Sequence, residues 1–376
     1  MLAEPAESHT RLVPRTRHVT IDLLRFLGCL AIAIWHYQHF SFVGDALPDF
    51  NVTQQPFYSW ASLFYEHGGR FRVQTFWSIS GFALFLAYGR TIAAHTLGPC
   101  KFFLDRVARL YPLYLVSFVA VVVLQWLYWS RNDVYFVYQN NDLFHAVLTL
   151  AMASAWWPNT GMSFNGPVWS LSVLIPVYAF FFATVWRRGP SIRFNLVVIV
   201  VSSLLYALLP DARLLECAAH FHAGGIGAIV LMRHGDGQYG RALRGLAAAV
   251  LTAFCAVAWI WGEAALVPVI HIVLLIVIPT LCFAAATIPR LPDAVATLFH
   301  WLGTLSYGVF LMHFPLQLAV VLLAAQLGLT LPVLSPWFFL LYLALIIIVA
   351  QIGLVLCERP AQRALRRLFG TARSAT

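Results

Sequence analysis

The chain has 376 residues, of which 61% are hydrophobic and 10% are charged, and its mean hydropathy is +0.77. Soluble domains carry about 25% charged residues, so this composition excludes a soluble globular protein and indicates an integral membrane protein. We interpret the net charge of +9 as a topology signal, because basic residues gather in cytoplasmic loops. No basic, aromatic-rich surface predicts nucleic-acid binding.

Apolar runs recur from one end of the chain to the other. A transmembrane helix needs about 20 apolar residues, and only helices or closed barrels satisfy the backbone in lipid. These runs are too long and continuous for barrel strands. We therefore predict an all-α integral membrane bundle of about ten transmembrane helices, at 21–43, 71–89, 110–130, 166–186, 194–210, 214–232, 243–262, 266–288, 298–325 and 336–357.

The runs predict one transmembrane domain, residues 21–360, between a cytoplasmic N-terminal tail (1–20) and a basic cytoplasmic C-terminal tail (361–376). The residues before the first run are polar and basic, and no small-residue cleavage site follows a short apolar core. We therefore expect the first run to be retained as a span. The six cysteines are isolated and form no CxxC pair, which favours packing roles over a disulfide framework or a zinc site.

Segment 143–157 decides the predicted topology. It is apolar but only fifteen residues long, which is typical of an interfacial piece. We predict a short non-spanning element on the outer face near 135–165, whose Tyr135, Tyr138, Trp156 and Trp157 suit the membrane interface. With the N-terminus inside, the positive-inside rule then predicts that both termini are cytoplasmic. The Lys and Arg residues expected outside are Arg70, Arg72, Arg131 and Arg213.

The first run contains a buried polar pattern. Arg25 and His36 are eleven residues apart, about three helical turns or roughly 16 Å, and Asp22 shares their face. A charge at the bilayer centre costs about 2.5–3.5 kcal/mol or more, so this face predicts a lined site. His36 would be a general base or an acyl-carrying nucleophile, and Arg25, paired with Asp22, would bind an anion. The alternative is a packing histidine with a snorkelling arginine.

A second basic group precedes the third run. Lys101 is the sole lysine, and Arg106 and Arg109 are three residues apart, so the two arginines can share a helical face. Two guanidinium groups and an ammonium form a plausible phosphate cradle. Ordinary positive-inside charge is the alternative interpretation.

Small and aromatic residues mark two further motifs. In Phe76–Phe82, Ser80 and Gly81 suit close helix packing, and Ser78 stands where a nucleophile elbow needs glycine. In Asn165–Ser172, Trp169 is either an interface anchor or, with Ser170, a site residue.

Histidines and a tyrosine in later runs are ambiguous. Tyr307 and His313 are polar groups at mid-membrane depth, either helix–helix hydrogen-bonding residues or site residues. His220 and His222 are two residues apart, so on a helix they face away from each other, whereas a chelating pair sits four apart. We predict no metal site.

The ordered motifs resemble the membrane acyltransferase type 3 family, the O-acyltransferases that modify bacterial glycans. The resemblance implies ten transmembrane helices, an acyl-CoA donor reached from the cytoplasm and a sugar acceptor often handled at the opposite face. It also implies that His36 is catalytic and that Arg25, Arg106 and Arg109 act on the donor side. The matching pieces are Ile21–Arg25 with His36, Phe76–Phe82, Arg106–Pro112, Trp169–Val173, Leu302–Tyr307 with His313, and Glu358–Pro360.

The resulting prediction is a multi-pass O-acyltransferase, most simply an O-acetyltransferase, of a bacterial cytoplasmic (inner) membrane. Acetyl-CoA or another acyl-CoA would be a co-substrate, with no permanently bound cofactor. The acceptor would be a hydroxyl of an exopolysaccharide, a lipid-linked oligosaccharide or another surface glycan, and polysaccharide-assembly proteins could be partners. We expect the acceptor to contact Ser80, Trp169, Ser170, Tyr307 and His313.

Two departures from the family pattern keep alternatives open. Family members commonly have an acid where this chain has Leu174, and many have one where it has Gln74. No extracytoplasmic SGNH-type hydrolase domain is expected in this sequence. A transporter or flippase for a carboxylate or glycan would also use intramembrane Arg and His residues, and a non-catalytic partner of an assembly complex is a third reading.

Overall fold

The computed structural model describes residues 18–368 except 49, 67, 236, 262–268 and 290. Within these residues the chain is helical and has no strand, apart from an isolated bridge between Val43 and Ala46. The predicted all-α class is confirmed. Most of the predicted N-terminal tail, residues 1–17, and the end of the predicted C-terminal tail, residues 369–376, lie outside the described residues.

The described helices follow the predicted runs closely. A 3₁₀ segment, His36–Ser41, continues the first helix, and a π segment, Leu354–Glu358, joins the last two. The helices are α1 (Val19–Trp35), α2 (Tyr58–Glu66), α3 (Gly68–Ala93), α4 (Pro99–Asn132), α5 (Leu143–Leu150), α6 (Trp169–Ser172), α7 (Leu174–Arg188), α8 (Ile192–Leu208), α9 (Arg213–His234), α10 (Gly237–Trp261), α11 (Ile270–Ala286), α12 (Asp293–Gln326), α13 (Pro336–Gly353) and α14 (Arg359–Leu368).

Local residues explain where several helices begin and end. The side chains of Asp142 and Ser191 accept hydrogen bonds from backbone N–H groups at the starts of α5 and α8, as N-cap residues do. Pro99 opens α4, where its missing N–H costs nothing. Gly189 follows α7 with a φ of 68°, a conformation that glycine adopts without strain.

Seven helical segments of the described chain are long and apolar enough to cross a membrane. The two apolar helices α8 and α11 are shorter, with 17 residues each, and α3 is not among the seven. A multi-pass membrane protein is therefore supported, while the count of ten spans stays a prediction. Helix α5 has eight residues and is about 12 Å long, too short to span, as expected for segment 143–157.

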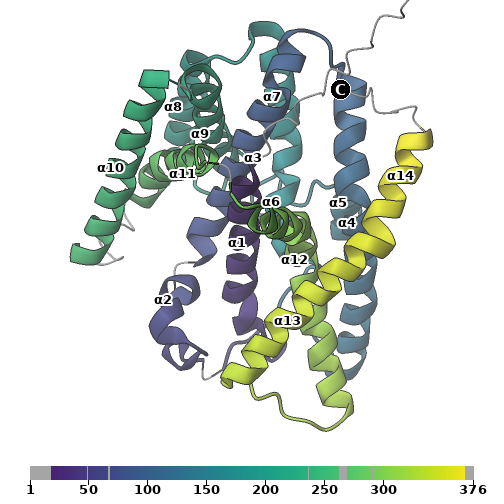
Figure 1. The fold of residues 1–376 in the computed structure, drawn as a ribbon. Helices are drawn as coiled ribbons and strands as arrows, with labels where there is room; N and C mark the ends of the chain where they lie inside the picture. Colours follow the sequence, from purple (N-terminus) through teal and green to yellow (C-terminus); the bar gives the residue numbers. More distant parts are fainter. Residues whose placement is uncertain are drawn as a thin grey trace, which may run out of the picture.

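Helix α1 lies near the middle of the bundle, against α3, α11 and α12 (Figure 1). Helices α3 and α9 approach backbone to backbone, because a Cβ atom on Gly81 would collide with the carbonyl oxygen of Phe221 and one on Gly224 with that of Ser78. The expected packing role of Ser80-Gly81 therefore applies at Gly81, as small residues allow close approach in membrane helices.

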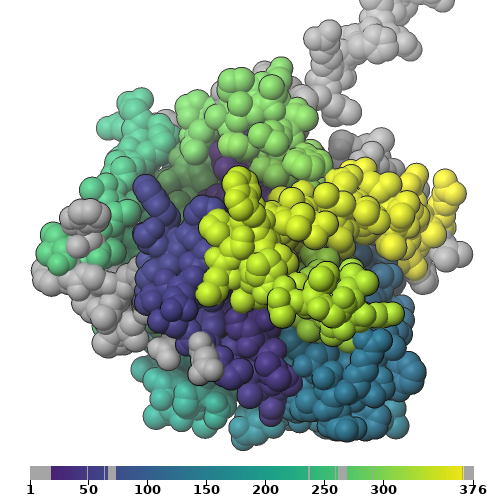
Figure 2. Space-filling view, turned by 90° about the horizontal axis from the view of Figure 1, so that it is seen from below, coloured from purple at the N-terminus to yellow at the C-terminus, as the bar shows by residue number. Residues whose placement is uncertain are grey.

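The end of the bundle where α1 finishes is covered by connecting segments. Figure 2 looks onto this end, where the chain after α1, in dark purple and blue, lies beside the α12–α13 region, in yellow-green. The Tyr37 hydroxyl donates to the carbonyl oxygen of Val333 at 2.8 Å, and the rings of Phe57 and Phe339 contact each other. These contacts hold the covering segments against the helices.

Candidate active site

Two cavities lie along α1, α3 and α12, at different heights in the bundle. The first, which we call the Arg25 cavity, has a volume of about 240 Å³. It brings together charged residues that are far apart in the sequence, namely Asp22, Arg25, Arg106, Arg109 and His300. The predicted donor-side arginines therefore lie in one place.

Hydrogen bonds orient the side chains of the Arg25 cavity. Asp22 accepts from Arg25 Nη1 at 3.2 Å through one oxygen and from His300 Nδ1 at 3.3 Å through the other. Arg106 Nη2 donates to the Tyr88 hydroxyl at 2.6 Å, and its guanidinium lies 4.9 Å from the centroid of the Tyr88 ring. The carboxylate of Asp22, which bridges Arg25 and His300, and the ring of Tyr88 thus orient two of the three guanidinium groups.

The Arg25 cavity suits a polyanion. It has three guanidinium groups and one carboxylate, so its charge is positive, and guanidinium groups bind phosphate oxygens in a fixed fork. Arg106 Nε is buried and has no hydrogen-bond partner among the described residues. Lys101, predicted to join this cradle, is exposed in the first turn of α4 and does not line the cavity.

The second cavity, the His36 cavity, has a volume of about 350 Å³. Its polar and aromatic lining comes from the end of α1, from the 131–165 segment and from the start of α6, and includes His36, His39, Tyr138, Trp169 and Ser170. The predicted catalytic histidine and two of the predicted acceptor residues therefore face one space.

The geometry of His36 selects its proton-accepting nitrogen. His36 Nδ1 lies 2.9 Å from the carbonyl oxygen of Ile32. A carbonyl can only accept, so Nδ1 carries the proton, and Nε2 is the acceptor of the neutral ring. Gln317 Nε2 donates to the His36 carbonyl oxygen at 2.8 Å, and Gln317 Oε1 lies 3.2 Å from His39 Nδ1. The 3₁₀ turn that begins at His36 is thereby fixed to α12.

Three imidazole rings are grouped here. The ring centroid of His36 lies 4.8 Å from that of His39 and 4.8 Å from that of His313. His313 is fully buried, Nδ1 lies 2.6 Å from the carbonyl oxygen of Phe310, and Nε2 has no hydrogen-bond partner among the described residues. His313, a predicted acceptor residue, therefore packs against the His36 ring and does not line the cavity.

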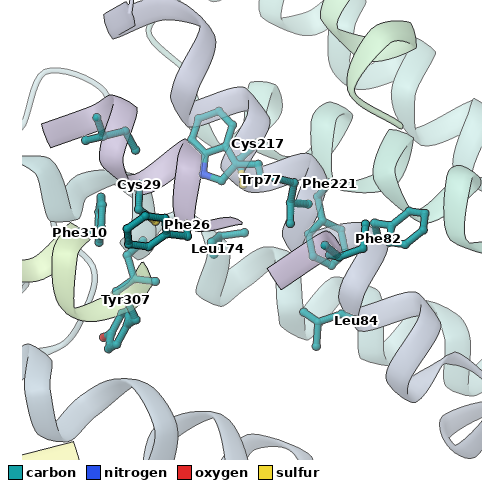
Figure 3. Close-up of a cluster of buried hydrophobic side chains, with 14 of the residues drawn as sticks. Phe26, Cys29, Trp77, Phe82, Leu84, Leu174, Cys217, Phe221, Tyr307 and Phe310 are labelled. Carbon is teal, nitrogen blue, oxygen red and sulfur yellow. The ribbon is translucent and has the colours of Figure 1, made fainter. Parts of the chain in front are cut away.

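An apolar partition separates the two cavities. On α1, Phe26 and Cys29 lie between Arg25, which lines the Arg25 cavity, and Ile32, which lines the His36 cavity. On α12, Tyr307 lies in the same way between Thr304 of the first cavity and Phe310 of the second. Figure 3 shows these side chains together, in the buried core cluster that contains Phe26, Cys29, Trp77, Leu174 and Tyr307.

Two predicted acceptor residues, and the position where the family commonly has an acid, lie outside the lining of both cavities. The Tyr307 hydroxyl donates to the carbonyl oxygen of Leu110 at 2.6 Å, which joins α12 to α4. Ser80 lines neither cavity. Leu174, at the position where the family commonly has an acid, is fully buried among apolar side chains.

The sequence reasoning missed several residues near the His36 cavity. Tyr138, predicted at the membrane interface, also packs its ring 5.8 Å from that of His39, in the cavity wall. Arg213, predicted on the outer side, is the first residue of α9, and its guanidinium lies 4.5 Å from the centroid of a Trp169 ring. Glu216 accepts from Gln74 Nε2 at 2.7 Å. The sequence could have identified His39, because it lies about one helical turn after His36.

Comparison with known proteins gives a family assignment. The sequence profile of a family described as an acyltransferase domain matches residues 18–355, most of the chain. No curated protein and no solved structure matches this chain. The family match, the helical bundle and the apolar spans agree with each other. The chain belongs to the membrane acyltransferase type 3 family and is an acyltransferase for groups other than aminoacyl groups.

Proposed function

We propose that the protein transfers an acyl group, most simply acetyl, from acyl-CoA in the Arg25 cavity to a hydroxyl of a surface glycan in the His36 cavity. One observation carries this proposal: an arginine-lined cavity and a histidine-lined cavity lie two to three turns apart on the same helices. A phosphate-bearing donor and a hydroxyl acceptor need these two different environments.

The donor half rests on the three guanidinium groups. Coenzyme A carries phosphates at one end and its thioester at the end of a long flexible arm. Arg25, Arg106 and Arg109 would bind phosphate oxygens through charge-assisted hydrogen bonds. The arm would then direct the thioester into the bundle, toward the apolar partition.

The acceptor half rests on His36 and the aromatic wall. Sugar rings pack their C–H faces on aromatic side chains, which Trp169 and Tyr138 supply. His36 Nε2 would take the proton of the sugar hydroxyl while its oxygen attacks the thioester carbonyl carbon. The C–S bond breaks, CoA leaves as the thiol after taking up a proton, and an ester remains on the sugar. In the relay version, His36 Nε2 carries the acyl group between donor and acceptor.

The direction of transfer rests on the charge distribution. Because the loops near the Arg25 cavity hold most of the basic residues, the positive-inside rule supports a cytoplasmic Arg25 cavity, cytoplasmic termini and a His36 cavity nearer the outer face. The acyl chain would then cross the partition formed by Phe26, Trp77, Leu174 and Tyr307. Glu216, beside Gln74, supplies a carboxylate near the acceptor end in the absence of one at Leu174.

The test is acyl transfer by the purified full-length protein in nanodiscs. The probes are radiolabelled acetyl-CoA and a panel of p-nitrophenyl glycosides, and the readouts are released CoA thiol and labelled glycoside. We expect the wild type to produce both in equal amounts and His36→Ala to produce neither. His95→Ala, in an exposed residue outside both cavities, is the matched control. Transport of label without thioester cleavage would overturn the proposal.

A further inference from the structure

A second group of polar side chains is buried next to the His36 cavity. Glu216 and His220 are four residues apart on α9, so they share one face, and His271 in the first turn of α11 faces them. One ligand atom from each of these three residues lies within 4.8 Å of the other two. Two imidazoles and a carboxylate are a common donor set for zinc.

The spacing of the two histidines fits a shared metal ion. His220 Nε2 and His271 Nδ1 are 3.2 Å apart. Tetrahedral zinc with Zn–N bonds of about 2.0–2.1 Å separates two ligand nitrogens by about 3.3 Å. The two ring nitrogens thus already have the separation that a shared zinc ion requires.

The surroundings orient two of the three ligands. Gln74 Nε2 donates to Glu216 Oε1 at 2.7 Å, and the Tyr206 hydroxyl also hydrogen-bonds to Glu216. The Ser203 hydroxyl lies 3.1 Å from His271 Nε2, the ring nitrogen that faces away from His220. Metal ligands are normally held by outer partners of this kind.

His220 is the most deeply buried residue of the cluster. His220 is fully buried, and its Nδ1 has no hydrogen-bond partner among the described residues. The other ring nitrogen, Nε2, is the one that faces His271. Arg213, the nearby cation, stacks on Trp169.

We propose that Glu216, His220 and His271 bind one divalent transition-metal ion, with Zn²⁺ the best fit. Imidazole ligands favour zinc or cobalt over magnesium and calcium, which prefer all-oxygen sites. Three protein ligands leave a fourth position for water. The ion would join α9 to α11, and through Gln74 its ligand Glu216 reaches α3, beside Val73 of the His36 cavity. Metal binding here requires neither the proposed donor nor the proposed acceptor, although Glu216 also lies near the acceptor end.

The sequence prediction of no metal site considered only the pair His220 and His222. His222 does face away from His220 and instead hydrogen-bonds to Asn195 through its Nδ1. The partner of His220 at the chelating spacing is Glu216, four residues before it, and the third ligand comes from another helix.

The experiment loads full-length detergent-purified protein with metal. The protein is treated with a chelator, desalted and titrated with Co²⁺, whose visible absorption reports four-coordination, and then with Zn²⁺. We expect about one Co²⁺ per chain, displaced by one Zn²⁺. His271→Gln and Glu216→Gln should each weaken Co²⁺ binding at least 10-fold, since even the loss of an outer partner of a ligand costs about 10-fold or more. His222→Gln, a buried histidine outside the cluster, should bind as the wild type does.

Each outcome decides the proposal. Absence of four-coordinate Co²⁺ in the wild type, or unchanged binding by His271→Gln, overturns it. Gel filtration and thermal unfolding without metal check the folding of each variant. If a variant does not fold, the wild type still gives a test, because Zn²⁺ should protect His271 at least 10-fold from diethyl pyrocarbonate. Equal modification with and without Zn²⁺ would refute the site.

Discussion

The Arg25 and His36 cavities share three helices and yet have opposite chemistry. The first has three guanidinium groups around a single carboxylate, and the second has imidazole, hydroxyl and aromatic groups with no Arg, Lys, Asp or Glu in its described lining. Permanent charges are expensive in a low-dielectric interior unless they are paired, whereas an imidazole can be neutral. The comparison indicates that anion binding and proton transfer are divided between two places.

The largest expected effect is in the His36 cavity. His36→Ala removes the proposed base or acyl carrier, and general base catalysis contributes about 10²–10⁴-fold. We expect kcat to fall by that factor while the KM for acyl-CoA changes little, as measured by CoA release. A large rise in that KM at wild-type kcat would mean that the two cavities are not divided in function.

The next effect is in the Arg25 cavity. Hydrogen bonds to charged groups contribute about 1.5–3 kcal/mol each, so Arg106→Ala and Arg109→Ala should each raise the KM for acyl-CoA by about 10- to 150-fold. Steady-state kinetics at varied acyl-CoA measures this, with kcat at saturation largely retained. The matched control is Lys101→Ala, whose side chain is exposed outside the cavity. An equal effect of Lys101→Ala would contradict the placement.

A smaller loss of activity should affect donor binding and turnover equally. Gly81→Ala and Gly224→Ala force α3 and α9 apart, because each new Cβ would collide with backbone of the other helix. Overpacking costs about 1–3 kcal/mol, so the thermal unfolding temperature should fall, with parallel losses in donor binding and turnover. Gly28→Ala is the control, since its Cβ meets nothing within 4 Å. Destabilisation by Gly28→Ala of the same size would show that helical glycines act in another way.

The smallest effect concerns the segment that covers the His36 cavity. The backbone N–H and side chain of His145 hydrogen-bond to Asp142 and hold the pKa of its carboxyl below the usual value. A lowered folded pKa means that Asp142 stabilises α5 above its unfolded pKa of about 3.9 and loses this effect as pH falls through the folded pKa.

Hydrogen exchange of residues 143–150 measures this contribution. We expect lower protection factors, relative to intrinsic exchange at the same pH, below about pH 4, and at neutral pH in Asp142→Ala, with little change in the KM for acyl-CoA. Asp105→Ala, in α4 outside both cavities, should leave exchange in α5 unchanged. Equal protection of α5 at pH 3 and pH 7 would contradict the assigned role.

Sequence alone determined the helices and the family. Apolar run length follows from the thickness of the bilayer and helix geometry, so the run 298–325 gave α12 with small errors at its ends. The short segment 143–157 was correctly separated from the spans because its length is a local property. Arg25 and His36 could be identified because a polar residue in an apolar run is costly wherever the helix packs.

Only the tertiary structure decided which residues meet. Arg106 and Arg109 join Arg25, while Lys101, from the same helix, stays exposed. Tyr138 turns inward to His39, although its sequence surroundings suited the interface.

The proposed metal ligands illustrate the same limit. The spacing of Glu216 and His220 is visible in the sequence, but His271 is supplied by the packing of α11 on α9. Local periodicity determines which face of a helix is polar, whereas the site depends on which faces of distant helices come into contact. The pairing of helix faces depends on close approach at positions such as Gly81 and Gly224. The physical reason is that the side-chain volume that both helices bring to a contact sets the distance and orientation of the two helices.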